Sequence, residues 1–251
     1  MSRLLVCGDL HLKPAGRDYD LDAIGVPDGV DATLILGDVT HRAGPDDVHL
    51  ARRFVGRIAE YVPVIYVPGN HDHTPMDQRI TEQVTAAESG HCAVYELDGI
   101  TVIGWGCEQR TLSSAIDQCE FSALDPRDVA PRDRRYAADQ IADEIEAACY
   151  NIICGTSTSR EAAASLGIKR SEQPTFERGI ADIRATYDQL ADLLHDKNDV
   201  ILATHIPPFN TSFDRHHAVG TREKDQEYLH VGSIALKLAI RDHDVFASLS
   251  G

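Results

Sequence analysis

The chain has 251 residues, with 24 basic and 40 acidic side chains and a formal net charge of −16. Hydrophobic residues make up 43%, enough for a sizeable core, and no stretch approaches the roughly 20 apolar residues of a membrane-spanning helix. A surface this acidic repels phosphate backbones, which disfavours a general nucleic-acid-binding role. The excess of Asp over Glu and of Arg over Lys predicts a halophilic protein, because dissolved ions screen self-repulsion at high salt.

The amino-terminal segment and the cysteines predict a cytoplasmic protein. Residues 4–8 are apolar and are followed at once by Asp9, which is typical of a buried strand and not of a signal peptide. The six cysteines include no Cys-x-x-Cys pair, so we expect them to be reduced. Because the sequence has no internal repeat and no linker-like run, we expect a single domain over residues 1–251.

Five short apolar runs predict buried β-strands. Each is partly β-branched and ends in turn residues, the pattern of strands buried on both faces. The runs are Leu4–Gly8, Thr33–Gly37, Val64–Gly69, Val200–Thr204 and Val245–Gly251. Helical patterns lie between several of them, at 45–61, at about 136–150, at 176–194 and at 232–243. This alternation predicts an α/β fold with a largely parallel sheet.

Four of the predicted strands are followed by residues that commonly bind metals. In chain order these residues are Asp9 and His11, then Asp38, then Asn70, His71 and Asp72, then His205. Any one of them could simply cap a strand end, but their recurrence at four strand ends favours one shared site at the carboxyl edge of the sheet. The donors are oxygen and nitrogen without thiolate, which suits Mn, Fe or Zn. One shared carboxylate can hold two ions about 3.5–4 Å apart.

The same segments resemble the successive motifs of the calcineurin-like metallophosphoesterase superfamily. The resemblance is carried, in the family's order, by Asp9-Leu10-His11, Gly37-Asp38, Gly69-Asn70-His71-Asp72 and Thr204-His205-Ile206-Pro207-Pro208. It implies an α/β fold of two packed β-sheets flanked by helices, an αββα sandwich. It also implies hydrolysis of phosphate mono- or diesters by in-line attack of a hydroxide that bridges two divalent ions.

The resemblance further implies which residues bind the ions. Asp9 and His11 would bind the first ion, Asp38 would bridge both, and Asn70 and His205 would bind the second. Mn²⁺ is the first choice of metal, with Fe or Zn as alternatives.

The catalytic roles implied by the resemblance fall on residues next to these ligands. His71 would contact the substrate phosphate and protonate the leaving oxygen, with support from a carboxylate such as Asp72. Arg42 matches an Arg often found after the second motif. His41 stands where the protein-phosphatase branch carries an Asp, which argues against that branch, and we assign His41 to substrate binding.

The family's last motif, Gly-His-x-His, would begin at Gly251, where the chain ends. The two imidazoles of that motif complete the two ligand sets, and further strands complete the sheet. The resemblance therefore implies that the last strands are missing. We expect the chain as printed, whether a fragment or a naturally shortened form, to be weakly active or inactive.

Two regions lie outside the motifs. Residues 107–175 fit the family least and predict a mostly helical insertion, either a solvated elaboration or a lid that carries Arg side chains to the substrate. His216, which follows the His205 motif, is a candidate substrate contact, although paired histidines in a polar loop are commonly exposed to solvent.

Taken together, the residues and the resemblance predict a cytoplasmic, metal-dependent phosphoesterase that acts on a small phosphate ester or a nucleotide. A DNA-repair exonuclease of the same superfamily is one alternative, and the overall acidity counts against it. A non-catalytic scaffold that has lost the last metal motif is another. The oligomeric state, and the choice between monoester and diester, are left open.

Overall fold

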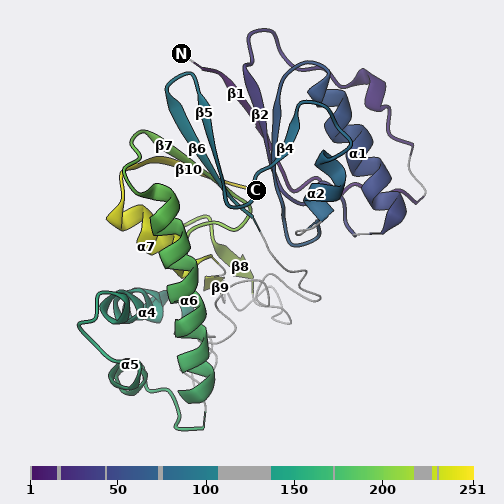
Figure 1. Ribbon diagram of the computed structural model, residues 1–251. Helices are drawn as coiled ribbons and strands as arrows, with labels where there is room; N and C mark the ends of the chain where they lie inside the picture. Colours follow the sequence, from purple (N-terminus) through teal and green to yellow (C-terminus); the bar gives the residue numbers. More distant parts are fainter. Residues whose placement is uncertain are drawn as a thin grey trace. The chain divides into compact units, whose positions relative to one another are not determined.

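The computed structural model describes residues 2–15, 18–42, 44–72, 76–106, 137–171, 173–217, 228–230 and 232–251 (Figure 1). The chain divides into two compact units. The first unit comprises Met1–Thr111, Asp196–Ile206 and Asp244–Gly251, and the second comprises Leu112–His195 and Pro207–His243.

The first unit contains a fully parallel sheet of four strands (Figure 1). They pair in the order β1 (Leu4–Cys7), β2 (Ala32–Leu36), β3 (Val64–Val67) and β4 (Ala87–Ser89). Every residue of β2 and β3 is buried, which explains why these runs are apolar throughout and do not alternate with polar residues. A short 3-10 helix, η1 (Leu21–Ala23), lies in the connection between β1 and β2.

Helices α1 (Pro45–Ala59) and α2 (Met76–Thr81) pack on this sheet and share a core with it. Proline at the start of α1 has the backbone angle that a first turn needs, and Asp46 and Asp47 place negative charge at the positive end of the helix. The buried residues of α1 recur every three or four positions and meet Ile35 and Tyr66 of the sheet. The helix predicted at 45–61 is confirmed, and it ends two residues earlier.

A second four-stranded sheet, also in the first unit, is mostly parallel. Its order is β10 (Val245–Ser250), β7 (Val200–Thr204), β6 (Ile100–Trp105) and β5 (Ala93–Leu97), with only the β5–β6 pair antiparallel. The chain reverses between β5 and β6 at Asp98 and Gly99, whose φ angles of 46° and 84° are those of the two-residue turn that matches strand twist.

The two sheets of the first unit share one apolar cluster. Leu34, Leu36, Ile65 and Val67 come from the first sheet, and Val102, Ile201 and Ala203 from the second. The predicted fold class, two packed sheets with flanking helices, is therefore confirmed. All five apolar runs form strands, but three belong to one sheet and two to the other, a division that an apolar pattern alone does not reveal.

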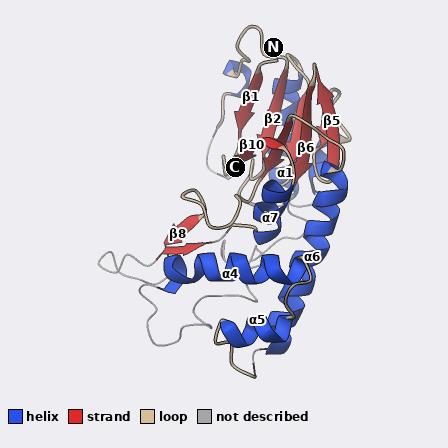
Figure 2. Ribbon diagram, turned by 90° about the vertical axis from the view of Figure 1, so that its left-hand side faces the viewer, coloured by secondary structure: helices blue, strands red, loops and turns tan. Residues whose placement is uncertain are grey.

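The second unit is mainly helical (Figure 2). It contains α4 (Ala137–Ile153), α5 (Ser159–Ser165), α6 (Gln173–Leu194) and α7 (Ile234–Asp242), with an antiparallel pair, β8 (Arg215–His217) and β9 (Tyr228–His230). Ser233 caps α7 by accepting the Leu236 N–H at 3.1 Å, and Thr158 and Glu161 form a capping box on α5. The three helices predicted in this unit are confirmed with shifted ends. Of the insertion predicted at about 107–175, residues 107–136 lie outside the described residues.

Within the described ranges, no helix combines the length and the apolar character needed to cross a membrane. Cys7 and Cys154 are free thiols.

Candidate metal centre

All the predicted metal ligands belong to the first unit and follow strand ends. Asp9 and His11 follow β1, Asp38 follows β2, Asn70 follows β3, and His205 follows β7. Beyond the last paired residues of β1 and β2, the chain continues side by side, because the Asp9 N–H donates to the Gly37 carbonyl and the His11 N–H to the Asp38 carbonyl, both at 2.9 Å. The strand ends therefore bring the ligands to one place.

Asp38 is the centre of this group. It is only 2% exposed, and its Oδ2 lies 3.7 Å from His11 Nε2, 3.8 Å from His71 Nε2 and 3.5 Å from His205 Nε2. These distances are too long for hydrogen bonds. The other oxygen, Oδ1, accepts the His71 backbone N–H at 2.8 Å. One oxygen of a buried carboxylate thus faces three imidazole nitrogens without hydrogen bonding to any of them.

Burial raises the pKa of the Asp38 carboxyl, and attraction to His205 opposes that rise only in part. A buried carboxylate is costly unless a positive charge or several hydrogen bonds compensate it. A divalent cation beside Oδ2 would supply that compensation.

His205 and Asn70 form a second contact in which two atoms that could bind a metal face each other. His205 Nδ1 lies 2.8 Å from the Leu36 carbonyl oxygen, which can only accept a hydrogen bond, so Nδ1 carries a proton. In the neutral ring Nε2 then presents a lone pair, and it lies 2.9 Å from Asn70 Oδ1, another electron-pair donor. Two such donors facing each other are arranged to share a cation.

Asp9, His11 and Asp38 form a group that could bind a metal ion, because one potential ligand atom from each lies within 4.8 Å of the others. Asp9 Oδ1 lies 3.0 Å from His11 Nε2. His11, His41 and His71 meet the same criterion. The structure thus brings the four other predicted ligands together near Asp38, and it places His41, which we assigned to substrate binding, beside them.

His41 packs among the other imidazoles. Its ring stacks on that of His71 at 5.1 Å between centroids, and its Nδ1 lies 3.4 Å from His11 Nδ1. Burial lowers the pKa of His41, and the neighbouring charges of His71, Lys13, His11 and Arg42 lower it further. A neutral ring is the form that can accept a proton or bind a metal.

Three of the predicted ligands have an unusual backbone. The φ angles of Asp9, His11 and Asp38 are 54°, 48° and 53°, in the left-handed region that residues other than glycine rarely occupy. Such strain persists only where surrounding structure enforces it, and it concentrates at functional sites.

Glycine permits the close approach of the strand ends. A Cβ on Gly69 would overlap Asp38 Oδ1, and a Cβ on Gly37 would come within 2.7 Å of His205 Nδ1. Gly37 also has a φ of 82°. The glycines that precede Asp38 and Asn70 are therefore required by the packing of the ligands themselves.

The side chain of Asp72 stabilises the backbone of this cluster through hydrogen bonds. Its side chain accepts the backbone N–H groups of Asp38 and Val39, both at 3.0 Å, that of Gly69 at 2.5 Å, and the hydroxyl of Tyr66. The sequence analysis gave Asp72 the task of supporting His71. In the described residues, His71 Nδ1 instead lies 2.7 Å from the carbonyl oxygen of His41, while Asp72 fixes the turn that presents Asp38.

Two further predicted residues are Arg42 and His216. Arg42 is exposed and lines a hollow next to His41. His216 has its backbone in β8 of the second unit, and its side chain lies outside the described residues. Sequence reasoning missed Tyr66, although a tyrosine inside a fully buried strand must find a hydrogen-bond partner and was therefore a usable signal.

The donor set, the buried carboxylate and the facing lone pairs fit a centre for divalent cations. The sequence profile of calcineurin-like phosphoesterases matches residues 2–230. The chain belongs to the calcineurin-like phosphoesterase family. This is a family of metal-dependent phosphoesterases, and the match confirms the superfamily predicted from the motifs.

A solved structure and the curated proteins complete the comparison. The phosphopantetheinyl hydrolase from Mycobacterium tuberculosis is similar to this chain with a TM-score of 0.48 and 17% sequence identity, over 100% of this chain and 82% of that one. No curated protein matches the chain.

Proposed function

We propose that this member of the calcineurin-like phosphoesterase family hydrolyses a small phosphate mono- or diester with two divalent ions held around Asp38. The observation that supports it most strongly is the Asp38 carboxylate, which is buried beside three imidazole nitrogens that it does not hydrogen-bond. Asp9 and His11 would complete one ligand set, and Asn70 and His205 the other. When bound, such ions polarise the phosphoryl group and supply hydroxide at neutral pH.

The protein's own groups would handle the leaving group. His71 Nδ1 is engaged by the His41 carbonyl, so the proton that reaches the leaving oxygen would be carried on Nε2. The stacked His41 ring limits rotation of His71 about its side-chain bonds and keeps Nε2 directed at the cluster. Arg42, exposed beside His41, would contact phosphate oxygens.

Hydrolysis of bis-p-nitrophenyl phosphate with added Mn²⁺, compared with p-nitrophenyl phosphate, tests this proposal. We expect metal-dependent release of p-nitrophenol by the chain, at a low rate, and its loss in Asp38→Asn. Equal hydrolysis by Asp38→Asn and by the unchanged chain would contradict the proposal. Digestion of single-stranded DNA would favour the exonuclease alternative, and a folded protein that binds no metal would favour the scaffold.

Three finer proposals rest on the sequence alone. We propose Mn²⁺ as the native ion, and parallel assays with Fe²⁺ and Zn²⁺ rank the candidates. We propose adaptation to high salt because of the net charge of −16, and activity measured from dilute buffer to molar salt tests it. We propose a cytoplasmic location, which fractionation of the source cells would test.

A further inference from the structure

A hollow of about 670 Å³ adjoins the candidate metal centre within the first unit. Its lining comes from the loop after β1, from His41 and Arg42 after β2, and from α1. His41 belongs to both places, because its ring stacks on His71 and also lines the hollow. The volume lies within the range of small-molecule sites, roughly 300–1,000 Å³. The hollow can therefore receive the part of a substrate that extends from a phosphate held at the metal centre.

The charges of the lining are balanced. Three basic and three acidic side chains contribute to it, namely Lys13, Arg42 and Arg53, and Asp18, Asp46 and Asp47. A second phosphate would gain no net attraction from such a lining. Carboxylates beside apolar side chains suit a different ligand, one that donates hydrogen bonds from hydroxyl groups and presents an apolar face.

The basic and the acidic side chains also occupy different parts of the hollow. Lys13 and Arg42 are both next to His41, because Arg42 follows it in the chain and the carbonyl of Leu12, the residue before Lys13, accepts the His41 N–H at 3.2 Å. They therefore lie toward the end of the hollow where a phosphate would bind. Asp46 is exposed in the first turn of α1, and the hollow also contains Tyr19 and the buried Leu50. An ester would thus meet cations at its phosphate and a carboxylate with apolar surface at its organic part.

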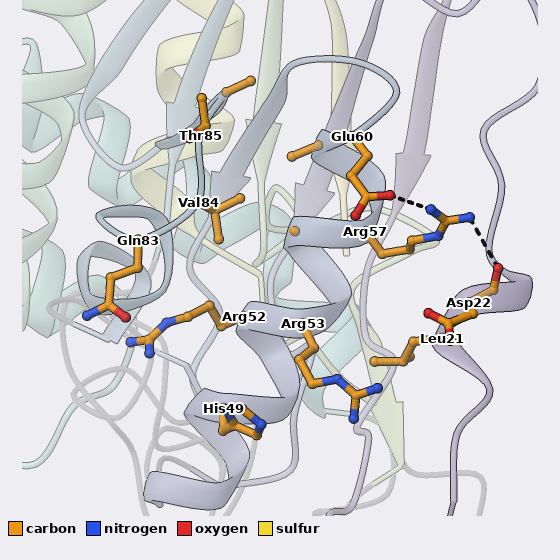
Figure 3. A pocket seen from close by; sticks show the side chains of 13 residues that line it. Leu21, Asp22, His49, Arg52, Arg53, Arg57, Glu60, Gln83, Val84 and Thr85 are labelled. Carbon is orange, nitrogen blue, oxygen red and sulfur yellow. Dashed lines mark hydrogen bonds and ion pairs between the residues drawn. The ribbon is translucent and has the colours of Figure 1, made fainter.

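A neighbouring hollow of about 580 Å³ along α1 offers a contrast (Figure 3). Two of its cations are held by the protein itself, since Arg57 pairs with Glu60 and with the Asp22 carbonyl, and Arg52 donates to the Arg79 carbonyl at 2.7 Å. His49 and Arg53 line both hollows. The side chains that Figure 3 draws include none of the candidate metal ligands.

We propose that the hollow beside His41 binds the hydroxyl-bearing organic group of the substrate, which makes the substrate a phosphate ester of a sugar or of a nucleoside. Asp46 accepts hydrogen bonds from the hydroxyl groups, and Tyr19 and Leu50 contact the carbon face. This inference rests on the proposed function and narrows its substrate class.

Calorimetric binding of three monophosphates to the full chain tests the proposal without turnover. The ligands are ethyl phosphate, ribose 5-phosphate and uridine 5′-phosphate, measured with the unchanged chain, with Asp46→Asn and with Asp28→Asn. Asp28 is an exposed carboxylate that does not line the hollow, and it serves as the matched control. We expect ribose 5-phosphate to bind about tenfold more tightly than ethyl phosphate, the usual worth of a hydrogen bond to a charged group. Asp46→Asn should remove most of that preference, and Asp28→Asn should retain it.

The uridine arm separates the two sources of a hydroxyl-bearing group. Uridine 5′-phosphate binding more tightly than ribose 5-phosphate would assign a nucleoside, and equal binding would assign a sugar. The proposal is overturned if ribose 5-phosphate has no advantage over ethyl phosphate, including the case in which neither binds, or if Asp46→Asn leaves the advantage intact. Because bis-p-nitrophenyl phosphate carries no sugar, its hydrolysis reports separately on the proposed function.

Discussion

The centre around Asp38 in the first unit and the pair of Asp214 and His230 in the second unit both bury a carboxylate beside an imidazole. Asp214 Oδ1 lies 2.7 Å from His230 Nδ1 and accepts the Thr211 N–H at 2.9 Å. Its Oδ2 accepts the N–H groups of Asn210 at 2.9 Å and Gly232 at 3.2 Å. Asp38 Oδ2, by contrast, faces its three imidazole nitrogens at 3.5–3.8 Å.

The difference separates a structural carboxylate, Asp214, from the proposed metal ligand, Asp38. Hydrogen bonds to both oxygens compensate the burial of Asp214, and its geometry leaves no lone pair directed at an open space. In the proposed centre, Asp38 keeps one oxygen for a cation that its neighbours also face. Asp72 resembles Asp214, because its two oxygens accept hydrogen bonds from three backbone N–H groups and a hydroxyl.

Asp214→Asn should give the largest loss of stability. The side-chain NH₂ group of the asparagine would then face backbone N–H groups, so donors would oppose donors. His230 would also lose its charged partner. We therefore expect a loss of about 3–5 kcal/mol in the free energy of unfolding. Urea unfolding measures it. Metal binding by the folded variant should match that of the unchanged chain. If Asp214→Asn lowered both stability and metal affinity, the proposed difference between Asp214 and Asp38 would be contradicted.

Asp38→Asn should show the opposite behaviour. Metal affinity should fall by about 100-fold or more, because a ligand shared by two ions is lost, whereas the metal-free protein should be no less stable than the unchanged chain. Titration with Mn²⁺ and urea unfolding in chelator measure the two effects. A stability loss as large as that of Asp214→Asn would contradict this prediction.

The pH dependence of the same variant sharpens the comparison. Burial raises the pKa of Asp38 above its usual 3.8, so the folded metal-free state holds this proton more tightly than the unfolded chain does. The contribution of this group to stability is therefore present at low pH and is lost as the pH rises through its raised pKa. Unfolding experiments in chelator should show a steeper fall in stability with rising pH for the unchanged chain than for Asp38→Asn, and identical profiles would contradict the prediction.

Gly69→Ala tests whether close backbone approach assembles the centre. The added Cβ would overlap Asp38 Oδ1, so we expect a loss of about 1–3 kcal/mol in stability and weaker metal binding. Gly25→Ala is the matched control, because its Cβ would meet nothing within 4 Å. Both are measured by urea unfolding and Mn²⁺ titration, and equal effects would refute the role of Gly69.

Tyr66→Phe should give the smallest effect. It removes one of the four hydrogen bonds to Asp72 and should cost about 1 kcal/mol. Tyr61→Phe, at a residue that is 47% exposed, should change stability by less than about 0.5 kcal/mol. Thermal unfolding of both variants checks this, and a loss in Tyr61→Phe that equals the loss in Tyr66→Phe would count against it.

The sequence predicted those features that are local. Apolar runs identify strands, and Gly37 and Gly69 before Asp38 and Asn70 mark the turns, because each signal lies within a few residues. The assignment of β7 to a second sheet and the contact of Tyr66 with Asp72 depend on packing between distant segments. The His41 carbonyl beside His71 could not be predicted either, since a backbone oxygen carries no sequence signature.

Calorimetric titration of the chelator-treated chain with Mn²⁺, alongside Asp38→Asn and Asp214→Asn, tests the central claim most directly. We expect two ions to bind to the unchanged chain and to folded Asp214→Asn, and binding to be lost or much weakened in Asp38→Asn. Unchanged binding in Asp38→Asn, with loss in Asp214→Asn instead, would contradict it.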